Sequence, residues 1–217
     1  MRFKAVCFDL DGTLLDTLED LAFCTNKILS KLGYPTHHVN AFRYFIGDGA
    51  KMLMTRVLPE NVRNETLIEK CRKEFETLYR EYWKRRTVPY QGIPELLSAL
   101  IKLNLKMAVL SNKPQEFTLL SVNQLLCDWN FDLILGQREG VPLKPNPAGM
   151  LEICQQLKIP SDHILYLGDT ATDMKTAVAA GCFPVGALWG FRGEQELKEG
   201  GAQVMIGKPL EVLDLLN

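Results

Sequence analysis

Short, almost continuously apolar segments recur along this chain, and each ends at a polar residue or a glycine. The first, RFKAVCFDL, covers residues 2–10 and is followed directly by Asp11-Gly12. The same pattern returns four times, at residues 105–112, 131–136, 163–169 and, more weakly, 182–188. Continuous apolar character, without alternating polar positions, is typical of strands that are buried on both faces. We therefore expect a parallel sheet whose two faces are covered.

Helical patterns separate these segments, at residues 94–103, 114–126, 147–157 and 171–180. Pro94, Pro114 and Pro147 stand at or near a first turn, where a missing N–H group has no cost. Strands that alternate with helices predict a Rossmann-like parallel sheet of the α/β class, wound by right-handed crossovers. Such sheets bind ligands at the carboxyl ends of their strands, so we expect the site there.

One long region breaks this alternation. Over residues 16–87 the sequence shows helical periodicity and no convincing strand. Its longest amphipathic segment covers residues 64–86, with a predicted apolar stripe of Leu67, Cys71, Phe75, Leu78 and Tyr82. We expect residues 16–87 to form an all-helical cap domain, inserted into a core domain of residues 1–15 and 88–217.

Composition excludes several functional classes. With 47% hydrophobic and 24% charged residues, the chain has the composition of an ordinary globular protein. Its formal net charge of −1 argues against a dedicated nucleic-acid-binding protein, which would carry a basic surplus. The sequence shows no signal-peptide pattern and no apolar run near the ~20 residues that span a bilayer. We expect a cytoplasmic protein that binds neither nucleic acid nor membrane.

The first expected strand ends in two acids, Asp9 and Asp11, which are followed by Gly12 and Thr13. Residues two apart in a strand point to the same side, so both carboxylates would converge on one small volume. Such neighbours repel each other, and a hard divalent cation that prefers oxygen ligands would neutralise them. Mg²⁺ is the usual choice beside phosphates. The alternative is an ordinary Asp-Gly turn whose acids are solvated.

A second acidic pair follows a later strand, in the motif GDTATD. Asp169 stands at the expected strand end, and Asp173 follows four residues later, one helical turn away, so both can face one point. Alternatively, Thr170 and Asp173 form a capping box at the start of the helix. That alternative accounts well for Asp173 and poorly for Asp169.

Two further motifs follow strands. SNKP, at residues 111–114, offers the Ser111 hydroxyl and free N–H groups to an anion, although Ser111 taken alone is also a common turn residue. LKPNP, at residues 143–147, holds Lys144 in a proline-stiffened loop, where a lone lysine is usually solvated. Because all four motifs follow strand ends, we expect them to meet at one edge of the sheet.

Together, the order and spelling of these motifs resemble the haloacid dehalogenase superfamily of phosphohydrolases. Its four motifs appear here as FDLDGT, SN, KP and GDTATD. The likeness covers the whole chain, because residues 16–87 fall at the position of the family's helical cap and WGFRGEQELKEGGA resembles the tail of its phosphoglycolate-phosphatase branch. The resemblance implies a Mg²⁺-dependent phosphatase that hydrolyses a small phosphorylated metabolite, as a monomer or homodimer.

The resemblance also implies a role for each matched acid. Asp9 would attack phosphorus and become an aspartyl-phosphate, and Asp11 would act first as general acid and then as general base. Mg²⁺ would be bound by Asp9, by the backbone carbonyl of Asp11 and by Asp169. Asp173 would lie in or just behind that metal shell.

The remaining motif residues would bind the phosphoryl group. Ser111 and the N–H groups near Leu10, Asp11 and Asn112 would contact the phosphoryl oxygens, and Lys144 would bridge the nucleophilic carboxylate and the phosphate. Four acids around one phosphate would repel it. Mg²⁺, Lys144 and the backbone dipoles would turn this repulsion into a net attraction for the phosphate.

The most informative stretch of the expected cap is RYFIGDGAKML. Gly47 and Gly49 flank Asp48, so the backbone there can approach a ligand closely. Arg43 and Lys51 flank this loop and are candidates to bind a second anion of the substrate. The alternative is a plain glycine turn with solvated basic neighbours. A small cap with a cationic loop favours small anionic metabolites such as phosphoglycolate.

Other activities stay open at this point. An inorganic pyrophosphatase or a phosphoglucomutase of the same superfamily would keep these motifs, although threonine at position 13 mildly favours a phosphatase. A catalytically idle binding module is an alternative of another class. It would be expected to lack one of Asp9, Asp11, Lys144 and Asp169, and all four are present.

Overall fold

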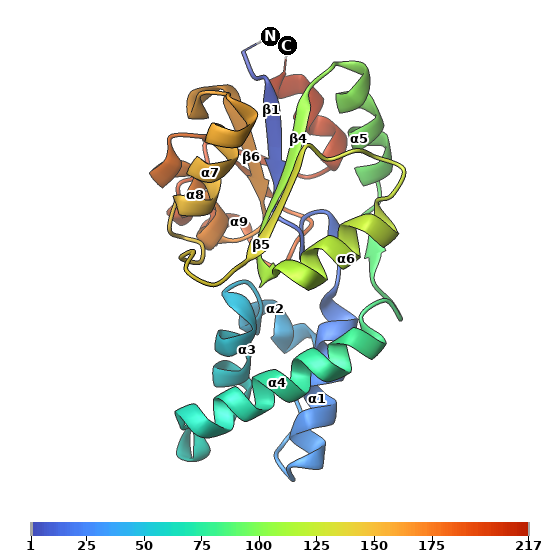
Figure 1. The fold of residues 1–217 in the computed structure, drawn as a ribbon, viewed down its shortest axis with the longest axis vertical. Helices are drawn as coiled ribbons and strands as arrows, with labels where there is room; N and C mark the ends of the chain where they lie inside the picture. The colour runs from blue at the N-terminus through green and yellow to red at the C-terminus, as the bar shows by residue number, and fades with distance from the viewer. Residues whose placement is uncertain (1, 217) are drawn as a thin grey trace.

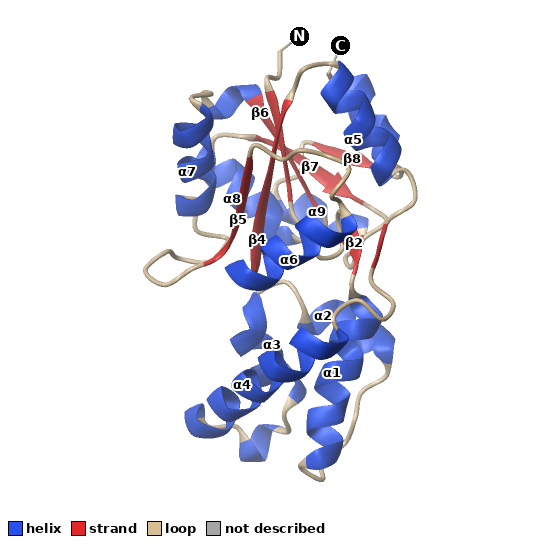
Figure 2. Cartoon of the chain, turned by 45° about the vertical axis from the view of Figure 1, so that its right-hand side comes forward, coloured by secondary structure: helices blue, strands red, loops and turns tan. Residues whose placement is uncertain are grey.

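Within the described residues, six parallel strands form one sheet in the upper half of the molecule as drawn in Figures 1 and 2. The computed structural model describes residues 2–216; Met1 and Asn217, the outer ends of the expected core domain, lie outside the described residues. The strands are β1 (Ala5–Phe8), β4 (Lys106–Pro114), β5 (Leu133–Gln137), β6 (Ile164–Gly168), β7 (Phe183–Ala187) and β8 (Val204–Ile206). The predicted α/β class with a Rossmann-like parallel sheet is confirmed, and β8 is an addition to it.

The strand order is β5-β4-β1-β6-β7-β8, so β1 lies inside the sheet and the chain extends from it in both directions. β1 pairs with β4 on one side and with β6 on the other, and Phe8 is the register partner of Val109 and Leu167. The carboxyl ends of β1, β4 and β6 therefore lie side by side where the strand order reverses. Parallel α/β sheets bind their ligands at this edge.

Helices cover both faces of the sheet. They are α5 (Ile93–Lys102), α6 (Gln115–Leu125), α7 (Ala148–Leu157), α8 (Ala171–Ala180) and α9 (Glu194–Gly200), followed by the 3₁₀ segment η4 (Pro209–Leu215). Alternate residues of β1 serve the two faces. Val6 and Phe8 pack in the apolar cluster that contains α5 residues, and Ala5 and Cys7 pack in the cluster that contains α7 residues. This period of two explains why the strand is apolar throughout.

A separate layer of helices lies beyond the carboxyl edge of the sheet, in the lower part of Figure 1. It consists of α1 (Leu18–Lys31), α2 (Phe42–Phe45), α3 (Gly49–Val57) and α4 (Glu65–Tyr82). These helices pack around an apolar cluster that includes Ile28, Met54 and Phe75. The chain enters the layer through β2 (Leu15–Asp16) and leaves it through β3 (Val88–Pro89), and these two strands pair antiparallel. Two adjacent connections thus join the helical layer to the sheet.

The buried face of α4 differs from the predicted one. Cys71 and Phe75 are buried as expected, together with Ile68 and Tyr79. Three predicted positions are only partly buried: Leu67, Leu78 and Tyr82. Both sets of residues follow a helical spacing, so periodicity alone leaves the rotation of the helix about its axis open. Packing against α1 and α3 determines that rotation.

The longest described helix, α4, has 18 residues, and its outer face carries ion pairs such as that between Arg72 and Glu69. None of the helices within residues 2–216 combines the length and the apolar character that crossing a membrane requires.

Asp20 fixes the junction between the two layers. It lies in the first turn of α1 and is 1% exposed. Its Oδ2 atom accepts hydrogen bonds from the backbone N–H groups of Arg86 and Thr87, both at 2.9 Å, and from the Thr87 hydroxyl at 2.8 Å. One carboxylate oxygen thereby joins the start of the helical layer to the segment that returns to the sheet.

We predict that Asp20→Ala lowers the free energy of unfolding by about 3 kcal/mol, because two buried donors of Thr87 and the partly buried N–H of Arg86 lose their acceptor. Urea denaturation followed by circular dichroism measures this change. Asp128→Ala is the control, since Asp128 is exposed, and it should change the stability by less than about 0.5 kcal/mol. Equal stability of the two variants would contradict the role assigned to Asp20.

Candidate active site

Asp9 follows β1 directly and is 6% exposed. Its backbone N–H donates to the carbonyl of Leu167 at 2.9 Å, which continues the ladder between β1 and β6 by one residue. The side chain is therefore fixed at the sheet edge. Its Oδ1 atom lies 2.8 Å from the ammonium of Lys144.

Lys144 is buried within the site. It therefore differs from most lone lysines in loops, which are solvated. Its Nζ atom donates to Asp9 at 2.8 Å and to Asp173 at 2.7 Å, and contacts the Leu110 carbonyl and the Tyr166 hydroxyl at 3.0 and 3.1 Å. Burial by itself would lower the pKa of Lys144, but the two carboxylates outweigh it and raise the pKa above its ordinary value. Lys144 is therefore a fixed positive charge.

Asp169 follows β6 and is fully buried. Its Oδ1 atom accepts from the Thr13 hydroxyl at 3.0 Å, and its Oδ2 atom accepts from the backbone N–H of Phe191 at 2.7 Å. Gly12, with φ of +89°, lies against this carboxylate, and a Cβ atom at Gly12 would come within 2.3 Å of Oδ2. Glycine is required here both for its backbone conformation and for the space it leaves.

The two carboxylate oxygens of Asp173 have different partners. Oδ2 accepts from the backbone N–H and the hydroxyl of Thr170, at 3.0 and 2.7 Å, and the two residues form a capping box at the start of α8. Oδ1 faces the ammonium of Lys144 at 2.7 Å and the hydroxyl of Tyr166 at 3.1 Å. The capping box and the contact within the site are therefore both present, one on each oxygen atom.

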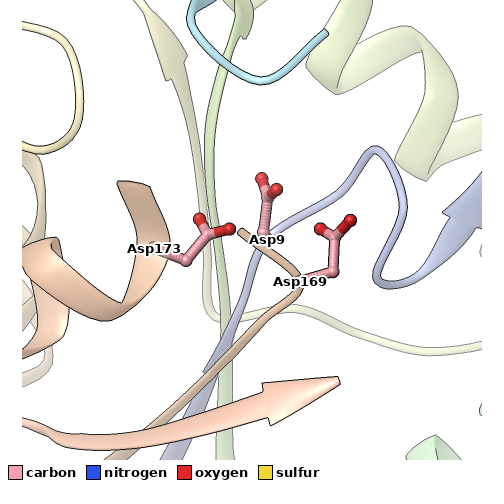
Figure 3. A group of neighbouring side chains, drawn as sticks. All are labelled: Asp9, Asp169 and Asp173. Atoms are coloured by element: carbon pink, nitrogen blue, oxygen red, sulfur yellow. The ribbon is translucent and has the colours of Figure 1, made fainter. Parts of the chain in front are cut away.

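Asp9, Asp169 and Asp173 form one buried acidic group, drawn in Figure 3. Each offers a carboxylate oxygen, and these three atoms all lie within 4.8 Å of one another. Figure 3 shows Asp9, at the end of β1, between the other two side chains. Carboxylate oxygens brought this close together are a ligand set that suits a hard divalent cation.

Burial makes the charged form of this acidic group unfavourable. Burial first, and then the charge of Asp173, raise the pKa of Asp9 from 3.8 to about 7, against the opposing effect of Lys144. Burial and the charges of Asp173 and Asp9 also raise the pKa of Asp169 well above its ordinary value. Within residues 2–216, Lys144 is the one cation that pairs with these three acids. A divalent cation therefore fits the group by charge as well as by ligand type.

Asp11 has a different environment. Its Oδ1 atom pairs with the ammonium of Lys113 at 2.8 Å, and Lys113 also donates to the Tyr79 hydroxyl at 2.8 Å. Sequence reasoning did not identify Lys113 or Tyr79. A signal for Lys113 is present in SNKP, because Ser111 and Lys113 are two residues apart in β4 and share a face of that strand. No comparable signal marks Tyr79, since the sequence does not determine the rotation of α4.

Ser111 and Asn112 lie near the carboxyl end of β4. The Ser111 hydroxyl accepts from the backbone N–H of Lys113 at 3.2 Å. The Asn112 side chain donates to the carbonyls of Gly47 and Lys144, at 3.0 and 3.1 Å, and accepts from the Lys144 N–H at 2.8 Å. Asn112 therefore joins the sheet edge to the Lys144 loop and to the helical layer.

The backbone turns sharply after Asp9. Four successive N–H groups donate to carbonyls within this turn: those of Gly12, Thr13, Leu14 and Leu15. The N–H groups of Leu10 and Asp11 donate to no other group within residues 2–216. These two N–H groups are available to an anion at the sheet edge.

A cavity of about 530 Å³, its open mouth included, lies between the sheet edge and the helical layer. Asp9, Asp11, Ser111, Asn112 and Lys113 line it from the sheet side. The helical layer contributes mostly apolar side chains and two glycines: Leu21, Ile46, Gly47, Gly49, Ala50, Leu53, Phe75 and Tyr79. Polar groups that converge in an otherwise apolar cavity are typical of a small-molecule site.

Some of the residues predicted as a substrate-binding loop line the cavity, and the others do not. Gly47 and Gly49 line the cavity, with φ angles of +122° and +86°. Arg43, Asp48 and Lys51 are not among its lining residues. Their partners are the Gly190 carbonyl for Arg43, Arg56 and Thr172 for Asp48, and Glu65 at the surface for Lys51. Neither basic side chain faces the cavity in this structure, because other partners hold both of them.

Comparisons with known proteins agree with this geometry. The profile of the family described as haloacid dehalogenase-like hydrolase matches residues 6–187. A phosphoglycolate phosphatase from Chromobacterium violaceum is 32% identical, over 100% of this chain and 97% of its own length. An N-acetylmuramic acid 6-phosphate phosphatase from Pseudomonas aeruginosa is 31% identical, over 100% of this chain and 96% of its own length.

A solved structure extends the similarity to the fold. The crystal structure of a protein from Lactobacillus delbrueckii subsp. bulgaricus, assigned as a phosphoglycolate phosphatase, matches with a TM-score of 0.93 at 29% identity, over 100% of this chain and 99% of that one. The chain belongs to the haloacid dehalogenase-like hydrolase family, which confirms the resemblance seen in its motifs. Within that family it is similar to phosphoglycolate phosphatases, and the prediction of an enzyme of the phosphoric monoester hydrolase class is confirmed.

We predict that, without metal, Asp9 makes the protein less stable as the pH rises from about 4 to about 7. The pKa of Asp9 is about 7 in the folded protein against an ordinary 3.8, so the folded protein keeps a proton that the unfolded chain releases. Asp169 acts in the same direction. Unfolding measured across this range in the presence of a chelator gives the pH dependence, and added Mg²⁺ should remove this contribution.

Asp9→Asn is the matched control for this measurement, because its side chain does not titrate. The difference in unfolding free energy between the wild type and this variant isolates the contribution of Asp9. A difference that stays constant across the pH range, with and without Mg²⁺, would contradict the electrostatic cost assigned to the acidic group.

Proposed function

We propose that this chain is a Mg²⁺-dependent phosphatase that hydrolyses a small phosphate monoester through an aspartyl-phosphate on Asp9. The observation that carries the proposal is the arrangement around Asp9. Asp9, Asp11 and Ser111 line one cavity, and Lys144 contacts Asp9 at 2.8 Å. A carboxylate nucleophile, an acid–base group, a fixed cation and a hydroxyl donor then lie together, as phosphoryl transfer requires.

The proposed reaction has two steps. A carboxylate oxygen of Asp9 bonds to phosphorus while the bond between phosphorus and the ester oxygen breaks, and Asp11 gives its proton to that leaving oxygen. Asp11 then takes a proton from water, whose oxygen attacks phosphorus and frees Asp9 and inorganic phosphate. The covalent intermediate divides one difficult displacement into two easier ones.

The donors proposed for the phosphoryl oxygens are the Ser111 hydroxyl, the free N–H groups of Leu10 and Asp11, and the ammonium of Lys144. Lys144 keeps its charge because Asp9 and Asp173 pair with it. Donors that are already in position need no rearrangement when negative charge develops on the phosphoryl group. They would also orient phosphorus towards Asp9.

Mg²⁺ would be bound by the carboxylates of Asp9 and Asp169 and by the backbone carbonyl of Asp11. Asp173 would lie in or just behind this set of ligands, with its Oδ1 atom beside Lys144 and its Oδ2 atom capping α8. The ion would supply positive charge that offsets the repulsion between the acids and the phosphate. The oxygen ligand set and the raised pKa of Asp9 support this assignment.

Residues 16–87 are proposed to act as a cap domain over a core domain of residues 1–15 and 88–217. The hydrogen bond from Asn112 to Gly47 joins the two across the cavity. The paired connections β2 and β3 are the place where a cap would pivot. Closure would expel bulk water and strengthen the electrostatic contacts to the phosphoryl group.

The proposed substrate is a small anionic ester, with phosphoglycolate as the first candidate. The names of two relatives support this choice, a phosphoglycolate phosphatase and an N-acetylmuramic acid 6-phosphate phosphatase. Both esters carry a carboxylate besides the phosphate. The polar groups that converge in this otherwise apolar cavity also suit a small anionic ligand.

A phosphate-release screen with and without Mg²⁺ tests this proposal. Phosphoglycolate is expected to release phosphate when Mg²⁺ is present, and N-acetylmuramic acid 6-phosphate is the second ester to test. A strong preference for pyrophosphate would indicate a pyrophosphatase, and isomerisation of glucose 1-phosphate without release would indicate a mutase. No release from any ester would contradict the phosphatase and favour a catalytically idle binding module.

We predict that Asp9→Asn abolishes phosphate release and leaves the protein folded, because an amide does not replace the carboxylate nucleophile. Asp128→Asn, at an exposed position, is the matched control and should keep full activity. Phosphate release measures turnover, and thermal unfolding shows that both variants fold. Near-normal turnover by Asp9→Asn would rule out the covalent pathway.

A further inference from the structure

Lys113 is a second buried lysine at the sheet edge, and the roles proposed above do not use it. It stands in β4, two residues after Ser111, and only 5% of its side chain is exposed. Its Nζ atom lies 2.8 Å from Oδ1 of Asp11 and 2.8 Å from the hydroxyl of Tyr79. The side chains of Asp11, Tyr79 and Lys113 all line the cavity.

Tyr79 reaches Lys113 from the helical layer. It is a fully buried residue of α4, and its ring stacks on Phe75 at 5.4 Å and meets Phe117 of α6 edge-on at 5.2 Å, measured between ring centroids. The Lys113 ammonium lies 4.6 Å from the centre of the same ring. Aromatic contacts from both layers therefore fix Tyr79. Its hydroxyl can meet Lys113 only while α4 lies over the sheet edge.

Lys113 stays charged although it is buried. Burial by itself would lower the pKa of Lys113, but Asp11 and then Tyr79 raise it above its ordinary value. Apolar side chains such as Leu53 and Phe75 line the same cavity, so the attraction between Lys113 and Asp11 is weakly screened. Separating the pair would leave a buried ammonium without its carboxylate, which is costly. The pair therefore holds the Asp11 side chain in one orientation.

We propose that Lys113 is a positioning residue for Asp11, and that Tyr79 makes this positioning depend on the helical layer. The inference rests on the proposed phosphatase function, in which Asp11 transfers protons. Without Lys113, no other ionic partner among residues 2–216 holds the Asp11 side chain towards the cavity. When α4 moves away, Lys113 loses the Tyr79 hydroxyl and water reaches the pair, which weakens its attraction. The Asp11 side chain would thus be held in position when the cavity is covered.

A competing explanation is that Lys113 binds a carboxylate on the leaving group of the substrate. Lys113 is the one cation among the described residues that line the cavity. The two explanations differ in their kinetics. A direct contact would matter only for esters that carry a carboxylate, whereas a positioning residue acts on every ester through Asp11.

Lys113→Met removes the ammonium and keeps most of the length of the side chain. We expect kcat to fall about 10²-fold, as for a displaced acid–base group, with KM changed less than about threefold. The loss should be equal for phosphoglycolate and for methyl phosphate, which has no carboxylate. Lys113→Arg should recover part of the loss. Tyr79→Phe keeps the ring and should lower kcat about three- to tenfold.

A double-mutant cycle tests whether Lys113 acts through Asp11. In an Asp11→Asn background, Lys113→Met should lower the remaining kcat by less than about threefold, because the group that it positions is already gone. Lys106→Met is the matched control. Lys106 lies in the same strand, is exposed and pairs with Asp132, so kcat should not change. Thermal unfolding of each variant separates loss of activity from loss of folded protein.

Three outcomes would each overturn the inference: an unchanged kcat in Lys113→Met, a rise in KM confined to carboxylate-bearing esters, or independent losses that multiply in the double variant. If Lys113→Met does not fold, Tyr79→Phe replaces it, and an unchanged kcat there overturns the inference. Failure of the proposed function can be told apart from failure of this inference, because the wild-type protein itself would then release no phosphate.

Discussion

Three carboxylates buried together at the carboxyl edge of a parallel sheet are the constraint on which the rest of this structure depends. Asp9, Asp169 and Asp173 repel one another, and burial raises the pKa values of Asp9 and Asp169. Lys144 contacts Asp9 and Asp173, Thr170 also donates to Asp173, and the Thr13 hydroxyl and the Phe191 backbone donate to Asp169. One lysine leaves negative charge uncompensated. A bound divalent cation would supply the missing positive charge.

The fold serves this group by bringing distant parts of the chain to one place. Strand β1 lies between β4 and β6, so residues at the carboxyl ends of all three meet where the strand order reverses. The helical layer covers the same edge with apolar side chains and with the backbone at Gly47 and Gly49. The charged groups of the cavity thereby come from the sheet edge, and the helical layer shapes the space above it. The contact from Lys113 to Asp11 and Tyr79 joins the two parts.

Features of the fold and site that local sequence patterns determine could be predicted, and features that depend on contacts between distant parts of the chain could not. The positions of Asp9 and Asp169 were predictable because local patterns fix strand ends, and parallel strands share one carboxyl edge. Nothing local distinguishes the buried Lys144 from a solvated lysine, so the family resemblance carried that prediction. The helices before residue 88 were predictable as helices, but not their packing. The burial of Tyr79 and the hydrogen bond from Arg43 to the Gly190 carbonyl depend on tertiary contacts, which helical periodicity does not encode.

The most direct test of the central claim is a crystal structure of the protein with Mg²⁺ and beryllium fluoride, which mimics a phosphoryl group. We predict that the ion contacts the carboxylates of Asp9 and Asp169, that beryllium is bonded to an oxygen of Asp9, and that Lys144 lies beside both. An ion bound elsewhere, or a fluoride complex away from Asp9 with the three acids unchanged, would contradict the claim that this acidic group is a metal-assisted phosphoryl-transfer site.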